Sequence, residues 1–235
     1  IAAASIGQVH RARTKDGRDL AIKIQYPGVK QSIDSDVDNV APLIRISGLL
    51  PKGVDVGPLL EEAKRQLHEE ADYQREGRYL EKFRTLLADD DRFIVPAFHE
   101  DFTTPSILAM DYVPGMPIEE AEHWPQADRN RVVGHLLDLM LQELFVFRLM
   151  QTDPNFANYQ YDEEQGRLIL LDFGATREFT ESLTEGYRAF MKAGMTSDRE
   201  AIRRAAMDLG FLDENISPEH QDLLIDIIDM GMESL

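Results

Sequence analysis

A short apolar run that ends in Asp-Phe-Gly constrains this chain more than any other feature of the sequence. The run Leu168–Leu171 has the composition of a short buried strand, and Asp172 follows it directly. A carboxylate fixed at the end of a buried strand can coordinate a magnesium ion that bridges phosphate groups. An Asp-Phe-Gly tripeptide alone is common, but after this strand and the polar loop before it the sequence predicts that Asp172 binds a metal in a site for a phosphorylated ligand.

The polar loop before this strand has a matching spacing. Asn158 stands fourteen residues before Asp172, and Asp153 stands five residues before Asn158. The catalytic loop of protein kinases has the same Asp-to-Asn interval, although Gln-Thr here replaces the His-Arg that precedes the Asp. In that arrangement Asp153 contacts or deprotonates the accepting group, and Asn158 holds a metal ion. An Asx-rich turn between a helix and a strand is the purely structural alternative.

A predicted hairpin near the start of the sequence carries a candidate phosphate-binding lysine. Residues 9–13 and 20–26 alternate in polarity, and a Gly-containing turn separates them. Lys23 ends the sequence Leu-Ala-Ile-Lys, which copies the kinase strand motif whose lysine reaches the α- and β-phosphates. A surface lysine on an edge strand would give the same alternation, so this motif alone leaves both interpretations open.

An alanine-rich segment lies where a kinase has its glycine-rich loop, which places backbone N–H groups over the nucleotide phosphates. Gly7 and Val9 occupy matching positions, but alanine replaces the first two glycines. Alone this match is weak, because an ordinary alanine-rich turn also explains it. The candidate nucleotide-binding residues are Ala2, Ala3, Ala4, Ser5, Gly7, Val9 and Lys23.

The four features occur in the order and at the spacings of a kinase, which makes the set far more specific than any single match. A kinase also needs an acidic helix residue that pairs with the lysine. We expect a charged amphipathic helix over residues 57–87, with Gly77 as a candidate interruption. Glu70 and Glu76 are about 240° apart on such a helix, so both cannot face Lys23. We expect Glu70 to be the partner and Glu76 to make another contact.

Composition excludes several other classes of protein. Lys plus Arg number 25 against 43 Asp plus Glu, and the net charge of −18 argues against nucleic acid as a partner. The absence of cysteine excludes a disulfide scaffold, a thiol nucleophile and cysteine-ligated zinc. Charged and polar residues interrupt the apolar stretch 132–150, so we expect a buried helix there and no transmembrane segment. Without an initiator Met or a signal peptide, the sequence is expected to be a fragment.

The 235 residues suit a single two-lobed domain. We predict an α+β, protein-kinase-like fold with a small β-rich N-lobe that carries inserted helices, residues 1–113, and a mainly helical C-lobe, residues 114–235. Further strands are expected at 93–96, 106–110 and 168–171, and further helices at 31–50, 127–150, 181–210 and 218–234. No Ala-Pro-Glu follows the Asp-Phe-Gly, and a helical pattern begins soon after Glu178, which leaves little room for a peptide-binding activation segment.

Together these motifs resemble the UbiB-type atypical kinase-like proteins linked to ubiquinone (coenzyme Q) biosynthesis, and most of all their mitochondrial and proteobacterial branch. Five blocks carry the resemblance: Ala2–His10, Ala21–Val29, Glu70–Glu76, Gln151–Asn155 and Leu171–Arg177. The family's N-terminal extension with a Lys-x-Gly-Gln motif is absent from this sequence.

The resemblance implies ATP or ADP with Mg²⁺ as cofactors, and ATPase or small-molecule kinase activity rather than ordinary protein phosphorylation. It implies membrane lipids and quinone-biosynthesis intermediates or enzymes as partners, and no nucleic acid. The expected location is the cytoplasmic face of a bacterial inner membrane or the matrix side of a mitochondrial membrane. A pseudokinase scaffold that binds nucleotide without turnover is the alternative, and a true protein kinase is a third hypothesis. The sequence does not name the acceptor of the phosphoryl group.

Overall fold

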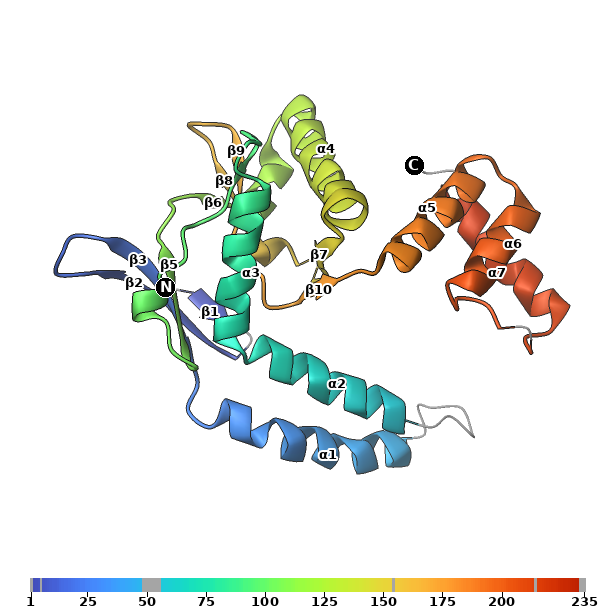
Figure 1. Cartoon of the computed structure of the whole chain (residues 1–235), viewed down its shortest axis with the longest axis horizontal. Coiled ribbons are helices and arrows are strands. Elements are labelled where there is room, and N and C mark those ends of the chain that lie inside the picture. The colour runs from blue at the N-terminus through green and yellow to red at the C-terminus, as the bar shows by residue number, and fades with distance from the viewer. Residues whose placement is uncertain (1, 5, 48–55, 154, 214, 233–235) are drawn as a thin grey trace. The chain divides into compact units, whose positions relative to one another are not determined.

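The computed structural model describes residues 2–4, 6–47, 56–153, 155–213 and 215–232 (Figure 1). The chain divides into two compact units, of which unit 1 comprises Ile1–Leu136 and Gln151–Thr176. Unit 2 comprises Leu137–Met150 and Arg177–Leu235. Every candidate site residue belongs to unit 1. The predicted lobe boundary between residues 113 and 114 stays a prediction.

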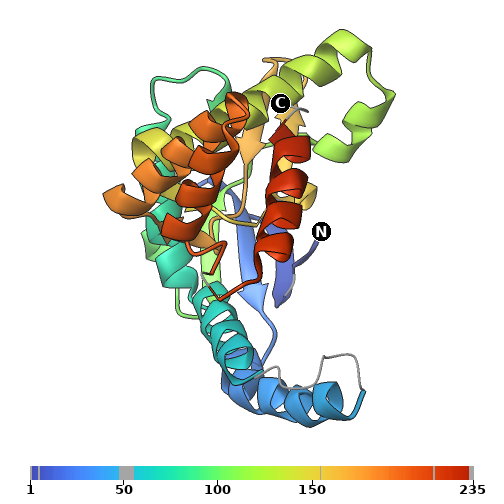
Figure 2. The same ribbon diagram turned by 90° about the vertical axis from the view of Figure 1, so that its right-hand side faces the viewer.

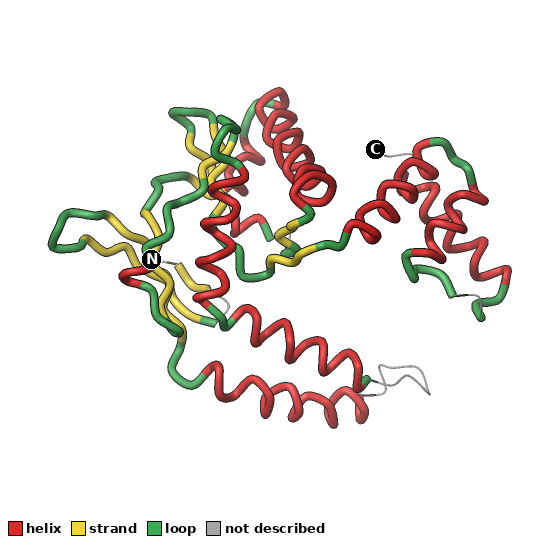
Figure 3. Tube along the Cα trace, viewed as in Figure 1, coloured by secondary structure: helices red, strands yellow, loops and turns green. Residues whose placement is uncertain are grey.

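The first sheet of unit 1 contains the predicted hairpin, in which a turn joins two long strands (Figure 3). Its four strands pair antiparallel in the order β1-β2-β3-β5. They are β1 (Ala2–Ala4), β2 (Gly7–Arg13), β3 (Asp19–Gln25) and β5 (Ile107–Asp111). Lys23 lies in the middle of β3, opposite Val9 of β2 and Leu108 of β5. The lysine is therefore on a central strand of the sheet and not on an edge strand.

Three helices follow the hairpin in the sequence: α1 (Val29–Ser47), α2 (Gly57–Glu70) and α3 (Tyr73–Leu86). Helices α1 and α2 lie side by side in both Figure 1 and Figure 2. An ion pair between Lys64 and Asp38, at 2.7 Å, and a hydrogen bond between His68 Nε2 and Asp34 Oδ1, at 2.9 Å, connect them. Helix α3 packs against β5. The predicted helix over 31–50 is confirmed as α1 up to Ser47, and residues 48–50 lie outside the described ranges.

The single helix predicted over residues 57–87 is two helices, and the break lies at Ala71 and Asp72 rather than at Gly77. Asp72 leaves the helical region (φ −95°, ψ 82°), and its side chain accepts a hydrogen bond from Arg75 N as the N-cap of α3. Gln25 Nε2 donates to Ala71 O at 2.7 Å and so ties β3 to the break. Gly77 lies inside α3, where a Cβ atom would be 2.3 Å from the ring of Phe98, so its role is close packing.

A second sheet in unit 1 has the strand order β4-β9-β8-β6, with β4 and β9 parallel and the other pairs antiparallel. Its strands are β4 (Phe93–Ile94), β6 (Met116–Pro117), β8 (Tyr159–Asp162) and β9 (Arg167–Leu170). The short 3₁₀ turns η2 (Ile118–His123) and η4 (Phe156–Asn158) accompany it, whereas η1 (Glu100–Phe102) packs against β5 of the first sheet. Strands β4, β5 and β9 confirm the three strands predicted beyond the hairpin.

The helix predicted over 127–150 ends early. Helix α4 (Gln126–Gln142) passes into the π-helical turn η3 (Glu143–Phe147), and Arg148 then takes left-handed backbone angles, with φ 51°. A π turn and a left-handed residue both interrupt the regular hydrogen-bond pattern, so the helix stops there. The chain continues as β7 (Leu149–Gln151), which pairs with β10 (Thr176–Glu178).

Unit 2 contains a helical cluster made of α5 (Glu181–Met195), α6 (Arg199–Asp208) and α7 (Pro218–Met232). These helices pack around Ile202 and Ile225, which are fully buried. The predicted helix over 181–210 is divided because Ser197 has a φ of 49° and Asp198 caps α6. Within the described ranges, no helix combines the length and apolar character that a bilayer-spanning segment needs.

Candidate active site

Three charged side chains from distant parts of the sequence meet in unit 1. Lys23 Nζ on β3 donates to both carboxylate oxygens of Glu76 on α3, at 3.0 and 3.2 Å, and to Asp172 Oδ2 at 2.9 Å. The Lys23 and Glu76 side chains are 7% and 0% exposed, whereas Asp172 is 31% exposed. The cluster is closed on the helix side, and a ligand from solvent would reach it at Asp172.

Burial and charge act against each other in this cluster. Burial lowers the pKa of the Lys23 ammonium, but the carboxylates of Glu76 and Asp172 outweigh that effect, so the pKa lies above its usual value. Burial raises the pKa of Glu76 to about 7, against the opposing effect of Lys23. Lys23 is therefore a cation at neutral pH, and the Glu76 carboxyl group beside it has no access to solvent.

The predicted pairing of Lys23 with Glu70 is wrong, since Glu76 occupies that place. The prediction assumed one continuous helix, but the chain leaves the helical conformation at Asp72. The angle between Glu70 and Glu76 therefore does not follow the spacing of a single helix. Glu70 ends α2, whereas Glu76 lies in the first turn of α3. A signal in the sequence did favour Glu76, because it shares a helix face with the buried residues Tyr73, Gly77, Leu80 and Phe83.

The Asp-Phe-Gly segment forms a tight loop directly after β9. Asp172 Oδ1 accepts a hydrogen bond from Gly174 N at 2.9 Å, which leaves Oδ2 for Lys23. The Phe173 side chain is buried, and its ring centroid lies 4.8 Å from that of Phe83 on α3. The backbone N–H of Phe173 donates to the Glu76 carboxylate. Hydrogen bonds and packing therefore fix both the backbone and the carboxylate of Asp172.

The loop between β7 and β8 brings Asp153 and Asn158 to the same end of the β8–β9 hairpin as Asp172. Asn158 Nδ2 donates to Asp153 Oδ2 at 2.9 Å. Leu171 N, one residue before Asp172, donates to Asn158 O at 3.0 Å. Asp153 is exposed, and its backbone N–H donates to Gln151 Oε1 at 2.6 Å. The fold thus gathers the three polar residues that the sequence analysis selected.

The chemistry of these side chains fits a nucleotide-bound magnesium ion. Asn158 uses its Nδ2 on Asp153, so its Oδ1 is the atom with which it could bind a metal beside the carboxylate of Asp172. Magnesium in proteins keeps waters and binds through one or two carboxylates plus substrate phosphates. Among the described residues, no group of three or more His, Cys, Asp or Glu could hold a metal alone.

The alanine-rich segment forms a strand and not only a turn. Ala2 lies opposite Val9, and Ala4 lies opposite Gly7, in the antiparallel pair β1–β2. A Cβ atom at Gly7 would be 2.2 Å from Ile24 O, so the close approach of β2 and β3 requires this glycine whatever the ligand. Ser5 lies outside the described residues. The role of this segment in phosphate binding stays a prediction.

Two residues that the sequence analysis did not select contact the backbone after Asp172. Arg75 on α3 donates to Gly174 O at 2.7 Å and also to Thr176 O. Thr152 donates to Ala175 O from its backbone N–H, at 3.2 Å, and from Oγ1, at 2.7 Å. Arg75 stands directly before Glu76 in the sequence, and Thr152 directly before Asp153. This adjacency to candidate site residues is the signal by which the sequence could have indicated their roles.

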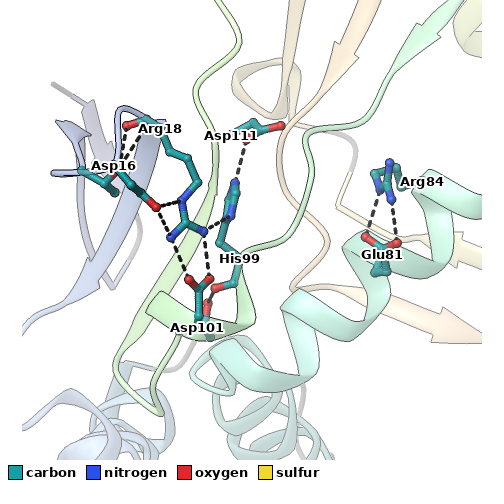
Figure 4. Close-up of polar contacts among 9 residues, drawn as sticks. Asp16, Arg18, Glu81, Arg84, His99, Asp101 and Asp111 are labelled. Carbon is teal, nitrogen blue, oxygen red and sulfur yellow. Dashed lines mark hydrogen bonds and ion pairs between the residues drawn. The ribbon is translucent and has the colours of Figure 1, made fainter.

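A second polar cluster fixes the end of β5, where the chain leaves the first sheet (Figure 4). The Arg18 guanidinium lies 2.8 Å from Asp101 Oδ2 and 3.2 Å from His99 Nδ1, and His99 Nε2 lies 2.7 Å from Asp111 Oδ1. Because arginine can only donate, His99 accepts at Nδ1 and donates from Nε2 to Asp111. The cluster connects the turn between β2 and β3 to the last residue of β5.

Comparison with known proteins gives the family. Residues 1–206 match the ABC1 atypical kinase-like domain. The mitochondrial atypical kinase COQ8B of Rattus norvegicus is 44% identical over 212 residues, which are 90% of this chain and 40% of that protein. The mitochondrial atypical kinase COQ8 of Saccharomyces cerevisiae is 39% identical over 228 residues, 97% of this chain and 46% of that protein. The chain belongs to the ABC1 atypical kinase-like family, and it spans less than half the length of these two relatives.

A solved structure supports the fold. The complex of Rv3197 with erythromycin from Mycobacterium tuberculosis gives a TM-score of 0.75 over 96% of this chain and 58% of that one, at 24% identity. The family match and this similarity confirm the predicted α+β, kinase-like fold and the predicted resemblance to UbiB-type proteins.

Proposed function

We propose that this chain binds ATP or ADP with Mg²⁺ and acts as an atypical kinase or ATPase that supports ubiquinone biosynthesis. The observation that carries the proposal is the cationic Lys23 held between Glu76 and Asp172, with Asp153 and Asn158 at the adjacent strand ends. A fixed cation, a metal-binding carboxylate and a second acidic residue are the parts that phosphoryl transfer needs.

In the proposed mechanism, Lys23 contacts the α- and β-phosphates while Asp172 and Asn158 hold the metal. The bound Mg²⁺ would neutralise charge that develops on the phosphate oxygens. Asp153 lies exposed beside Asn158, where it can position or deprotonate an accepting hydroxyl group or a water molecule. These roles rest on the motif order and on the geometry described above.

A non-peptide acceptor is the second part of the proposal. Strand β10 ends at Glu178 and helix α5 begins at Glu181, so the described chain has no segment there that could hold a peptide. The acceptor would then be water, a lipid or another small molecule. Two relatives are named as mitochondrial atypical kinases. Membrane lipids and quinone-biosynthesis intermediates or enzymes are the partners that we propose from the family resemblance. The matrix side of a mitochondrial membrane, or the cytoplasmic face of a bacterial inner membrane, is the proposed location.

ATP hydrolysis by the purified chain tests the proposal, with and without lipid vesicles and quinone precursors, followed by mass analysis of the products. Phosphate release without a phosphorylated product identifies an ATPase, and a phosphorylated lipid or precursor identifies a kinase. Nucleotide binding without turnover in every mixture would favour the pseudokinase scaffold instead. A phosphorylated protein as the main product would contradict the non-peptide acceptor.

A further inference from the structure

The backbone that follows Asp172 is held by side chains from two separate elements. Three consecutive carbonyls, at residues 174, 175 and 176, accept hydrogen bonds from the side chains of Arg75 of α3 and Thr152 of the loop between β7 and β8. No strand or helix includes residues 171–175. Backbone hydrogen bonds hold the two ends of this segment, at Leu171 and Ala175, and these side chains and the packing of Phe173 add the remaining contacts.

Arg75 is connected to the Asp172 carboxylate through a single residue. Its Nη1 donates to Gly174 O at 2.7 Å, and Gly174 N donates to Asp172 Oδ1 at 2.9 Å. Gly174 fits tightly here, since a Cβ atom would lie 3.3 Å from Asp172 Oδ1. Movement of the Gly174 backbone would turn the carboxylate, and Arg75 opposes that movement.

The same turn of α3 contacts both Lys23 and the segment that follows Asp172. Glu76 binds Lys23 and the backbone N–H of Phe173, and Arg75 binds the carbonyls of Gly174 and Thr176. The Arg75 guanidinium also lies 4.7 Å from the centroid of the Tyr79 ring, which helps to fix its direction. One turn of helix thus couples the position of the lysine to that of the carboxylate.

We infer that Arg75 is a positioning residue that sets the metal affinity of Asp172, with Thr152 as a weaker second contact. In protein kinases, phosphorylation of the activation segment controls whether the site is assembled. Here unmodified side chains, Arg75 and Thr152, hold the segment in place, so Asp172 is oriented without a phosphorylation step. The identity of the ligand in this inference rests on the proposed function. The position of the Asp172 carboxylate rests on the hydrogen bonds of Arg75 and Gly174.

A magnesium titration of ATP binding tests the inference on the full chain. Mutation of a residue that supports a metal-ligating carboxylate typically lowers metal affinity by about 10–100-fold. The Arg75→Ala variant should therefore need an Mg²⁺ concentration about tenfold higher, or more, to reach the midpoint of the titration. At saturating Mg²⁺ its ATP affinity should return close to that of the wild type. Arg75→Lys, which keeps one donor group, should show a smaller shift, and Thr152→Val, which keeps the backbone donor, a smaller one still.

Arg84→Ala is the matched control on the same helix. Arg84 forms an ion pair with Glu81 (Figure 4), and the two side chains are 49% and 44% exposed. This control should leave the Mg²⁺ midpoint unchanged. An unchanged midpoint in Arg75→Ala, or an equal loss of ATP affinity at every Mg²⁺ concentration, would overturn the inference.

Hydrogen exchange without nucleotide separates this inference from the proposed function. The amides of residues 173–176 should exchange faster in Arg75→Ala than in the wild type, and at the wild-type rate in Arg84→Ala. Equal exchange in Arg75→Ala and the wild type would overturn the positioning role. Absence of Mg²⁺-dependent ATP binding in the wild type would instead contradict the proposed function. If Arg75→Ala does not fold, Arg75→Lys and Thr152→Val carry both measurements.

Discussion

Lys23 Nζ lies within 3.2 Å of both carboxylate oxygens of Glu76, although 53 residues separate them in the sequence. Neither side chain of the pair is more than 7% exposed. Breaking a buried ion pair leaves an uncompensated charge, so the pair constrains how β3 and α3 can be arranged. Asp172 extends the contact to the Asp-Phe-Gly loop, and the three groups form the centre of the proposed nucleotide site.

Replacement of Glu76 by Gln should weaken Mg-ATP binding by about tenfold or more, because a charge-assisted hydrogen bond contributes about 1.5–3 kcal/mol. The amide oxygen of Gln could still accept from Lys23 but carries no charge, so Asp172 would be the remaining carboxylate beside Lys23, and that contact competes with the phosphates and the metal. Calorimetric titration of the folded variant measures the effect. Glu81→Gln is the control, since Glu81 is 44% exposed on the same helix and pairs with Arg84. Equal affinities in the two variants would contradict the role of Glu76.

Replacement of Gly7 by Ala should destabilise the first sheet. The added Cβ would lie 2.2 Å from the carbonyl oxygen of Ile24, which belongs to the backbone and cannot turn aside. Overpacking of this kind typically costs about 1–3 kcal/mol, and denaturant unfolding would measure it.

Gly134→Ala provides the opposite result for comparison. Gly134 lies in α4, and nothing lies within 4 Å of the position that a Cβ would take. Removing a glycine from a helix interior should stabilise the protein by about 0.5–1 kcal/mol. A Gly7→Ala variant as stable as Gly134→Ala would show that β2 and β3 are not so close at Gly7.

Replacement of Asp153 by Asn should preserve Mg-ATP binding and remove most of the turnover. Asp153 is exposed at the loop and contacts Asn158, so the isosteric amide keeps the shape while losing the base. Proton transfer or positioning by such a group contributes about 10²–10⁴-fold to the rate. Steady-state phosphate release measures turnover. Asp91→Asn, at a side chain 98% exposed, is the control. Turnover equal to that control would remove Asp153 from the mechanism.

The sequence was sufficient for the features that depend on short spacing. The hairpin with Lys23, the Asp153–Asn158 loop and the strand before Asp172 all follow from local alternation and motif order. Each of them lies where it was expected in the chain. The kinase-like fold followed from their sequence order, because motifs at such intervals are brought together by only a few folds.

The features that the sequence did not predict depend on contacts between distant residues. Asp72 resembles any surface carboxylate of a charged helix, and only Gln25 from β3, bound to Ala71 O, shows why the helix breaks there. The choice of Glu76 over Glu70 follows from that break. In the sequence, Arg75 resembles any other charged residue on the surface of a helix. Its partners are backbone carbonyls about a hundred residues away, at Gly174 and Thr176, and a sequence pattern does not reveal such partners.

Calorimetric titration of ATP into the wild-type chain and into Asp172→Asn, each with and without Mg²⁺, tests the central claim most directly. Asp172 is the partly exposed carboxylate of the cluster, and the amide keeps its shape while removing the charge that a metal needs. We predict Mg²⁺-dependent binding to the wild type and loss of the Mg²⁺ dependence in Asp172→Asn. Equal Mg²⁺-dependent binding by both proteins would contradict the assignment of this cluster as the nucleotide and metal site.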